Sequence, residues 1–70
     1  MKFLIEQVDH DDGITSVVLR FGDISISGFE AMDGGETIFP DNVEIPFELQ
    51  NNIKDKLLFA HIQMKKALRS

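Results

Sequence analysis

The stretch Phe47–Leu68, FELQNNIKDKLLFAHIQMKKAL, decides the fold of this chain, because it reads as one long helix. Each residue of an α-helix advances about 100° around the axis. On that wheel seven apolar residues fall within about 100° of arc, the width of a stripe that faces a core. They are Leu49, Ile53, Leu57, Ala60, Met64, Ala67 and Leu68. No glycine or proline interrupts the run, so the pattern predicts a helix that packs on a sheet.

The residues at both ends of this stretch fit the helix. Pro46 suits the first helical position, where a missing N–H costs nothing. An acidic side chain lies in the first turn and basic side chains lie near the last, which complements the helix dipole. These residues are Glu48, Lys65, Lys66 and Arg69. A helix of 22 residues spans roughly 33 Å, more than the width of a four-stranded sheet, so we expect it to overhang.

A second apolar face lies on the other side of the predicted helix. Leu58, Phe59 and Ile62 project roughly 120–180° away from the core stripe and form one patch in mid-helix. The chain offers no evident partner for this patch, so we expect it to contact a second subunit or another protein. Two alternatives stay open. The three residues could be ordinary exposed apolar side chains, or Phe59 could fold over the edge of the core.

The same face is complementary to itself, as a two-fold interface must be. In an antiparallel pair of helices centred near Ala60, facing residue numbers sum to about 120. Leu58 then meets Ile62 of the mate, Phe59 packs near the axis, and Asp55 approaches a lysine of the mate. We therefore predict a homodimer through the C-terminal helix. Its expected interface residues are Asp55, Leu58, Phe59, Ile62, Lys65 and Lys66.

The first two-thirds of the chain is predicted to form a β-meander. Four segments are strand-like by their apolar pattern, and they cover residues 2–9, 15–21, 24–32 and 37–39. The pair Asp12-Gly13 is a strong signal for a two-residue hairpin turn, and Gly22-Asp23 gives a second turn. The fourth segment ends at Pro40 and could instead be an extended link.

Two details decide which strand residues face the core. In the first strand, strict alternation puts Phe3 and Ile5 on the face opposite to Val8. In the third strand, the apolar residues change phase along the strand. A one-residue bulge at Ser27 and Gly28 would restore the core register.

The order of these elements predicts an α+β fold with ββββα topology. An antiparallel β-meander of three to four strands is followed by one long C-terminal α-helix packed on one sheet face. Seventy residues make a single domain, with the meander over residues 1–40, a linker over 41–45 and the helix over 46–69. Such a domain buries only about 60% of its unfolded surface. Because the chain has no cysteine, its stability must come from core packing or from oligomerisation.

Charge is distributed unevenly along the chain. Residues 1–45 hold ten acidic and two basic side chains, whereas residues 46–70 hold two acidic and five basic ones. This pattern lacks the basic footprint that neutralises phosphates, so nucleic acid is an unlikely partner. No stretch has the length of a membrane span or the apolar run of a signal peptide. We expect a cytoplasmic protein without a membrane partner, of a composition typical of small phage or bacterial proteins.

No catalytic residue, cofactor site or metal site is predicted. The run DHDDG at residues 9–13 lacks the glycine and glutamate positions of a calcium loop. His10 and His61 have no third ligand at a recognisable spacing. None of the serine or threonine residues lies in a nucleophile-elbow pattern. His61 lies at the edge of the helix stripe, where we expect it to flank the core.

The leading hypothesis is therefore a non-enzymatic interaction module, and two alternatives stand beside it. In the first, the acidic sheet imitates nucleic-acid phosphates and binds a basic groove of a host enzyme. That requires the acidic turns to cluster at one sheet edge. The residues concerned are Glu6, Asp9, Asp11, Asp12, Asp23, Asp33 and Glu36. In the second, the basic end of the helix binds nucleic acid weakly.

Overall fold

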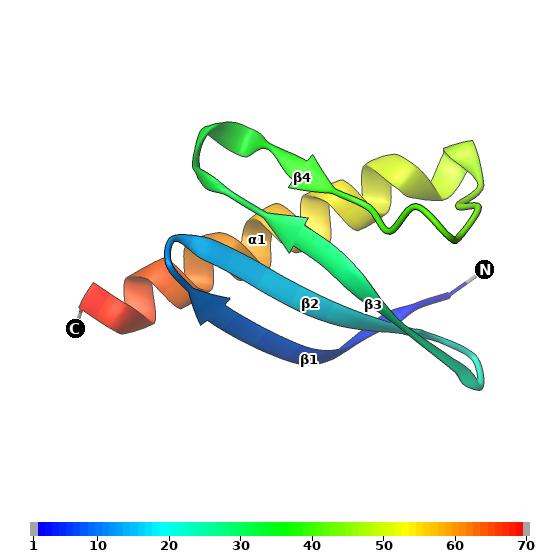
Figure 1. Cartoon of the computed structure of the whole chain (residues 1–70), viewed down its shortest axis with the longest axis horizontal. Helices are drawn as coiled ribbons and strands as arrows, with labels where there is room; N and C mark the ends of the chain where they lie inside the picture. Colours follow the sequence, from blue (N-terminus) through cyan, green and yellow to red (C-terminus); the bar gives the residue numbers. More distant parts are fainter. Residues whose placement is uncertain (1, 70) are drawn as a thin grey trace.

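The chain folds as one antiparallel sheet crossed on one face by a single long helix (Figure 1). This arrangement is a computed structural model that describes residues 2–69, without the side chain of Arg69. Its elements are β1 (Leu4–Asp11), β2 (Ile14–Phe21), β3 (Ile24–Ala31), the 3₁₀ turn η1 (Asp33–Gly35), β4 (Thr37–Ile38) and α1 (Phe47–Arg69). The strands lie in the order β1-β2-β3-β4. The predicted ββββα fold is confirmed.

Both hairpin turns form at the predicted positions. Asp12 and Gly13 have φ angles of 54° and 79°, and two positive φ angles in a row are what a type I′ turn requires. In the second turn Gly22 has a φ of 63°, which fits the first central position of a type II′ turn. Such turns match the twist of the flanking strands, so consecutive strands become neighbours.

The predicted bulge in β3 is confirmed. Ser27 and Gly28 lie opposite the single residue Val18 of β2. The extra residue shifts the alternation by one position. Phe29 and Ala31 therefore return to the core face, where both are fully buried.

A second bulge, which was not predicted, lies in β1. Glu6 is the extra residue, because the register with β2 shifts between Ile5 and Gln7. Phe3, Ile5 and Val8 consequently all pack against the core. The prediction that Val8 faces away from the other two was wrong, since strict alternation holds only in a strand without a bulge.

The core lies between α1 and the inner face of the sheet. Six apolar residues with at most 2% exposure form it: Val17, Leu19, Phe29, Ala31, Ile53 and Leu57. Two of these belong to the predicted helix stripe, but Leu68 at its end is exposed. The last turns of α1 extend past the sheet, as Figure 1 shows. None of the helices in the described part of the chain is long and apolar enough to span a membrane.

The chain leaves the sheet soon after β4 begins. β4 pairs only with Glu30 and Ala31 of β3. Pro40 then passes so close to Gly28 that a Cβ atom added to this glycine would lie 3.1 Å from the Cβ of Pro40. From there the linker runs to Pro46 without forming a further strand. Within residues 2–69, no strand therefore lies on the outer side of the N-terminal half of β3.

Candidate functional site

Five side chains form a continuous hydrogen-bonded chain at the end of the sheet that carries the β1–β2 turn. His10 Nδ1 lies 2.8 Å from Thr15 Oγ1, and His61 Nδ1 lies 2.7 Å from the same oxygen. On its other side, His61 Nε2 lies 2.8 Å from Asp33 Oδ1. Lys65 Nζ donates to that oxygen at 2.6 Å. We refer to these five residues as the histidine network.

The network joins four elements, β1, β2, η1 and α1, and each of them contributes at least one side chain. Thr15 has the same parity along β2 as Val17 and Leu19, so its side chain faces the core and is fully buried. His61 comes from the core-facing side of α1 and is 4% exposed. The rings of His10 and His61 stack with centroids 5.7 Å apart. Buried polar groups need hydrogen-bond partners, and here β1, β2 and η1 supply them to α1.

The hydrogen-bond partners determine where the protons lie. An ionised carboxylate only accepts hydrogen bonds, so we assign a hydrogen to the Nε2 atom of His61 facing Asp33. In the neutral ring the Nδ1 atom is then an acceptor, which takes the hydroxyl hydrogen of Thr15. The Thr15 oxygen in turn accepts from Nδ1–H of His10. With these assignments each of the four hydrogen bonds has one donor and one acceptor.

Asp33 is the charged end of the network and is itself well exposed. Its carboxylate accepts hydrogen bonds from Lys65 and His61, and these lower the pKa of Asp33 from 3.8 to about 2. The carboxylate is therefore ionised throughout the neutral range, and it holds the Nε2–H form of His61 in place.

Thr15, His61 and Asp33 are also the three residue types of a hydrolase triad. The Thr15 hydroxyl, however, lies fully buried between two rings, so a substrate carbonyl has no path to it in this structure. No group of three or more histidine and acidic side chains within residues 2–69 is placed to hold a metal ion. The network links α1 to β2 and η1 through His61 and Lys65.

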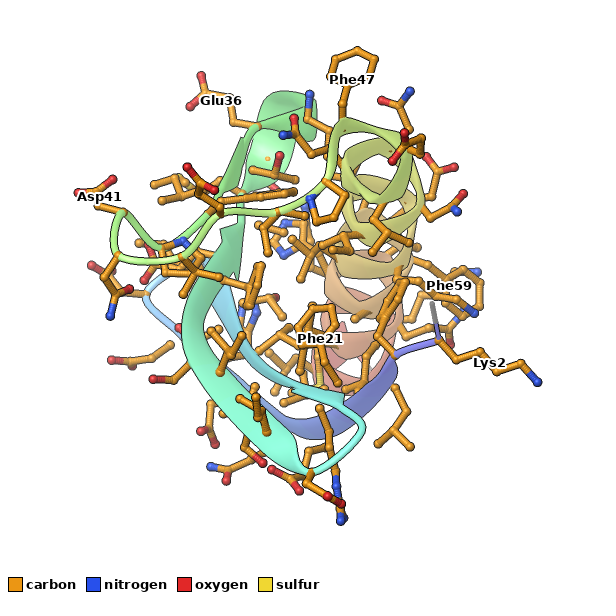
Figure 2. All side chains as sticks on the ribbon, turned by 90° about the vertical axis from the view of Figure 1, so that its right-hand side faces the viewer. Lys2, Phe21, Glu36, Asp41, Phe47 and Phe59 are labelled. Atoms are coloured by element: carbon orange, nitrogen blue, oxygen red, sulfur yellow. The ribbon has the colours of Figure 1, made fainter. Side chains whose placement is uncertain are left out.

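The predicted interface residues fall into two groups. Asp55, Phe59, Ile62 and Lys66 are exposed, with 61% exposure for Phe59 and 50% for Ile62. Figure 2 shows Phe59 pointing outward from the flank of α1, on the side where Lys2 lies.

The other two residues are used within the chain. Leu58 is half-buried and packs against the core cluster. Lys65 donates to Asp33. The structure thus gathers four of the six residues on one exposed strip of α1.

Sequence reasoning missed the histidine network, although one signal was present. Thr15 precedes Val17 and Leu19 on the inward face of its strand, and a polar side chain at such a position needs a partner. His61, at the edge of the helix stripe, was a natural candidate for that partner.

Comparisons of the sequence with protein-family models and with curated proteins, and of the fold with solved structures, find no match. Function is therefore argued from the surfaces of this chain.

Proposed function

We propose that the protein is a small protein–protein interaction module that forms a homodimer through α1. The observation that carries this proposal is an exposed strip along the helix, formed by Asp55, Phe59, Ile62 and Lys66. Their spacing places all four within roughly 60° of arc, as in the seam of a coiled coil. The strip has two apolar residues at its centre and opposite charges at its ends.

This strip is complementary to itself in an antiparallel pair. If facing residue numbers sum to about 121, each Phe59 meets Ile62 of the mate, and each Asp55 meets Lys66 of the mate. The sequence alone favoured a pairing one position away, with Leu58 opposite Ile62. Because Leu58 packs on its own core, the exposed residues favour the shifted register. Charges at the rim select register and orientation more than they add affinity.

A shallow depression beside the strip enlarges the proposed interface. It has a volume of about 670 Å³ and lies between the N-terminal segment and α1. Phe3, Leu49 and Asn52 line it, and Phe59 forms part of its border. Stable interfaces bury about 1,600 Å² in total, which needs contacts beyond four helix residues. The depression offers such contacts next to Phe59, the aromatic residue of the strip.

The two alternative functions receive less support from the arrangement of charges. Asp12 and Asp33 lie at the end with the β1–β2 turn, whereas Asp23 lies in the β2–β3 turn at the opposite end. Asp33 pairs with Lys65, and Glu6 pairs with Arg20 at 3.8 Å. Phosphate mimicry needs free carboxylates on one surface, and nucleic-acid binding needs free lysines.

The proposal is tested by the mass of the protein in solution. The wild-type chain should behave as a dimer in light scattering, and Phe59→Asp should weaken dimerisation by at least about 30-fold, the equivalent of about 2 kcal/mol. Phe47→Asp is the matched control, because Phe47 is 78% exposed but lies off the strip. A monomeric wild type, or a dimer that Phe59→Asp leaves intact, would refute the proposal.

A charge swap tests the antiparallel register. Asp55→Lys alone and Lys66→Asp alone should each weaken the dimer several-fold, because like charges then face each other across the axis. The double variant should recover the wild-type affinity. Failure of the double variant to recover would leave a dimer with a different geometry and would exclude the pairing of Asp55 with Lys66.

A further inference from the structure

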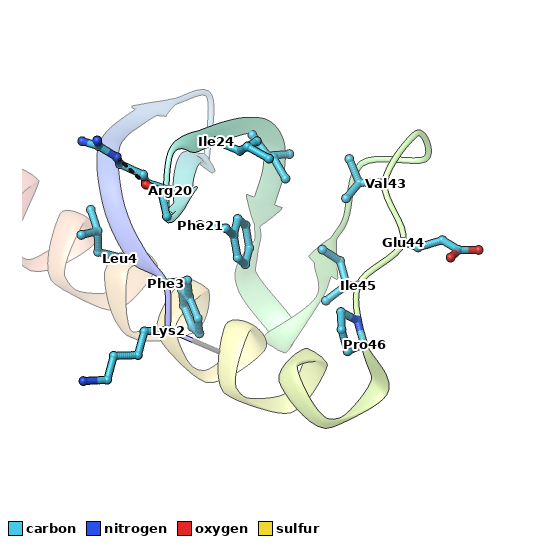
Figure 3. Close-up of a pocket in the computed structure, with 12 residues that line it drawn as sticks. Lys2, Phe3, Leu4, Arg20, Phe21, Ile24, Val43, Glu44, Ile45 and Pro46 are labelled. Carbon is cyan, nitrogen blue, oxygen red and sulfur yellow. Dashed lines mark hydrogen bonds between the residues drawn. The ribbon is translucent and has the colours of Figure 1, made fainter.

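The inner face of the sheet is uncovered at the end that carries the β2–β3 turn. An open groove of about 970 Å³ lies there, between the sheet, the linker and the start of α1 (Figure 3). We call it the end groove. Its apolar lining comes mainly from Phe3, Phe21, Ile24, Ile26, Val43 and Ile45. Ile24 is 63% exposed, so the groove presents apolar surface that this chain leaves without cover.

One wall of the end groove is a strand edge without a neighbour. β4 covers only Glu30 and Ala31, and Pro40 covers the edge next to Gly28. Among the described residues no strand lies beside Ile24–Ser27 on this side. A free edge presents backbone N–H and C=O groups that can pair with another chain.

We propose that the end groove binds an extended apolar segment of a partner protein, which joins the sheet as a short strand beside Ile24–Ser27. A strand of four residues is about 13 Å long, and its side chains point alternately to either face. Alternate residues of the bound segment would then enter the groove next to Ile24 and Ile26. The other residues would lie beside Ser25 and Ser27 on the outer face. Such strand addition combines backbone hydrogen bonds, which give affinity, with pockets that give specificity.

Charge at the mouth of the groove adds a further requirement for the bound segment. Lys2 and Arg20 flank the side near β1, and Glu44 lies on the linker across the groove, as Figure 3 shows. The guanidinium of Arg20 forms an ion pair with the carboxylate of Glu6, with 3.8 Å between nitrogen and oxygen. Lys2 makes no ion pair within the described residues. A segment beside the outer edge of β3 lies on the side of the linker and Glu44, with β2 between β3 and the strand that follows Lys2, so a basic residue of the segment complements this side of the mouth. The expected ligand alternates apolar and small polar residues and carries a basic residue toward Glu44.

The end groove is distinct from the proposed dimer strip. None of Asp55, Phe59, Ile62 and Lys66 lines it. Binding of a segment and dimerisation can therefore be measured separately, and the loss of one leaves the other testable.

The first experiment selects and then modifies the ligand. A library of random octapeptides displayed on phage is panned against the full chain, and the enriched peptides are synthesised for calorimetry. We expect alternating apolar sequences with a basic residue. Methylation of the backbone nitrogens that face β3 should lower the affinity at least tenfold, because it removes the donors and keeps the side chains. No enrichment, or affinity that is insensitive to methylation at every position, would overturn the proposal.

The second experiment places the ligand on the structure. Ile24→Lys should lower the affinity of the selected peptide at least tenfold. Ile38→Lys should change it less than twofold, because Ile38 is also exposed (46%) but lies outside the groove. Backbone amide signals of Ile24–Ser27 should shift on peptide binding. A peptide affinity that Ile24→Lys leaves unchanged would show that the peptide binds outside the end groove and would overturn the proposal. Binding of laurate as tight as that of the peptide would indicate an apolar ligand pocket and not a strand site.

Discussion

The two ends of the sheet's inner face are completed in opposite ways, although the same sheet and helix build both. At the end with the β1–β2 turn, the histidine network fills the interior with polar side chains that bond to one another. At the end with the β2–β3 turn, the surface is apolar and open. Thr15 is fully buried at the first end, whereas Ile24 is 63% exposed at the second.

The difference indicates that one end of the sheet contributes to stability and the other end to recognition. Thr15 and His61, the buried members of the network, bond to each other and to His10 and Asp33, and among the described residues only the buried hydroxyl of Thr37 lacks a partner at that end. The end groove keeps uncovered apolar surface and an unpaired strand edge, the two features that make a surface available for binding. Three predictions test the comparison.

The largest expected effect comes from removing the centre of the network. Thr15→Val deletes the hydroxyl and leaves the Nδ1 atoms of both histidines without their partner, one of them in a fully enclosed position. An unsatisfied buried polar group costs about 1–3 kcal/mol. In a domain of this size that lowers the melting temperature by about 4–8 °C for each kcal/mol. Thermal denaturation followed by circular dichroism measures it.

Thr15→Ser is the matched control, because it keeps the hydroxyl. It should retain the network and lose less stability than Thr15→Val. Nitrogen chemical shifts of the His61 ring should report the Nε2–H form in the wild type. If Thr15→Val were as stable as Thr15→Ser, the network would contribute nothing to the stability of the end with the β1–β2 turn.

A smaller and pH-dependent effect is expected at the charged end of the network. Because hydrogen bonds from Lys65 and His61 lower the pKa of Asp33 to about 2, its ionised form favours the folded state. That contribution is fully present above pH 4 and is lost as the pH falls toward 2. Wild type should therefore exceed Asp33→Asn in stability at pH 7, and the two should converge near pH 2.

Salt should also narrow the difference between wild type and Asp33→Asn, because Asp33 is well exposed and its pairing is screened. Asp23→Asn is a suitable control, since Asp23 makes no ion pair among the described residues. A constant difference between wild type and Asp33→Asn from pH 7 to pH 2 would contradict the assigned role of the carboxylate.

The smallest effect is expected at the open end. Ile24→Thr replaces an exposed apolar side chain by a smaller polar one that also favours strands. Substitutions at such surface positions usually change stability by less than about 0.5 kcal/mol. Denaturant unfolding should give nearly the wild-type midpoint. A loss comparable to that of Thr15→Val would mean that Ile24 belongs to the core and not to a binding surface.

Local sequence signals were sufficient to predict most of the fold. Asp12-Gly13 determined a hairpin turn through its positive φ angles, and the phase change at Gly28 located a bulge. The 3.6-residue periodicity located α1. Each of these signals lies within a few neighbouring residues. The bulge at Glu6 was missed because no glycine marks it, and because Leu4 is apolar with the same parity as Val8, which concealed the phase change between Ile5 and Val8.

The functional surfaces were less accessible to prediction for a physical reason. The histidine network joins residues that are far apart in the chain, such as Thr15 and His61, and its existence depends on how α1 lies across the sheet. The end groove depends on the path of the linker, which passes Gly28 of β3 at Pro40 and then turns away from the sheet. The exposed strip on α1 was predicted in part, because helical periodicity alone places Phe59 and Ile62 together.

The two bulges lie at the same level of the sheet, one on each side of Val18 in the central part of β2. Bulges bend a strand and increase its twist, so two of them facing each other form a crease across the sheet. We therefore expect the hairpin around Gly22, beyond this crease, to open more readily than the half that holds Thr15. Amide hydrogens should then exchange with solvent in two blocks, first beyond the crease and later on the side of the histidines.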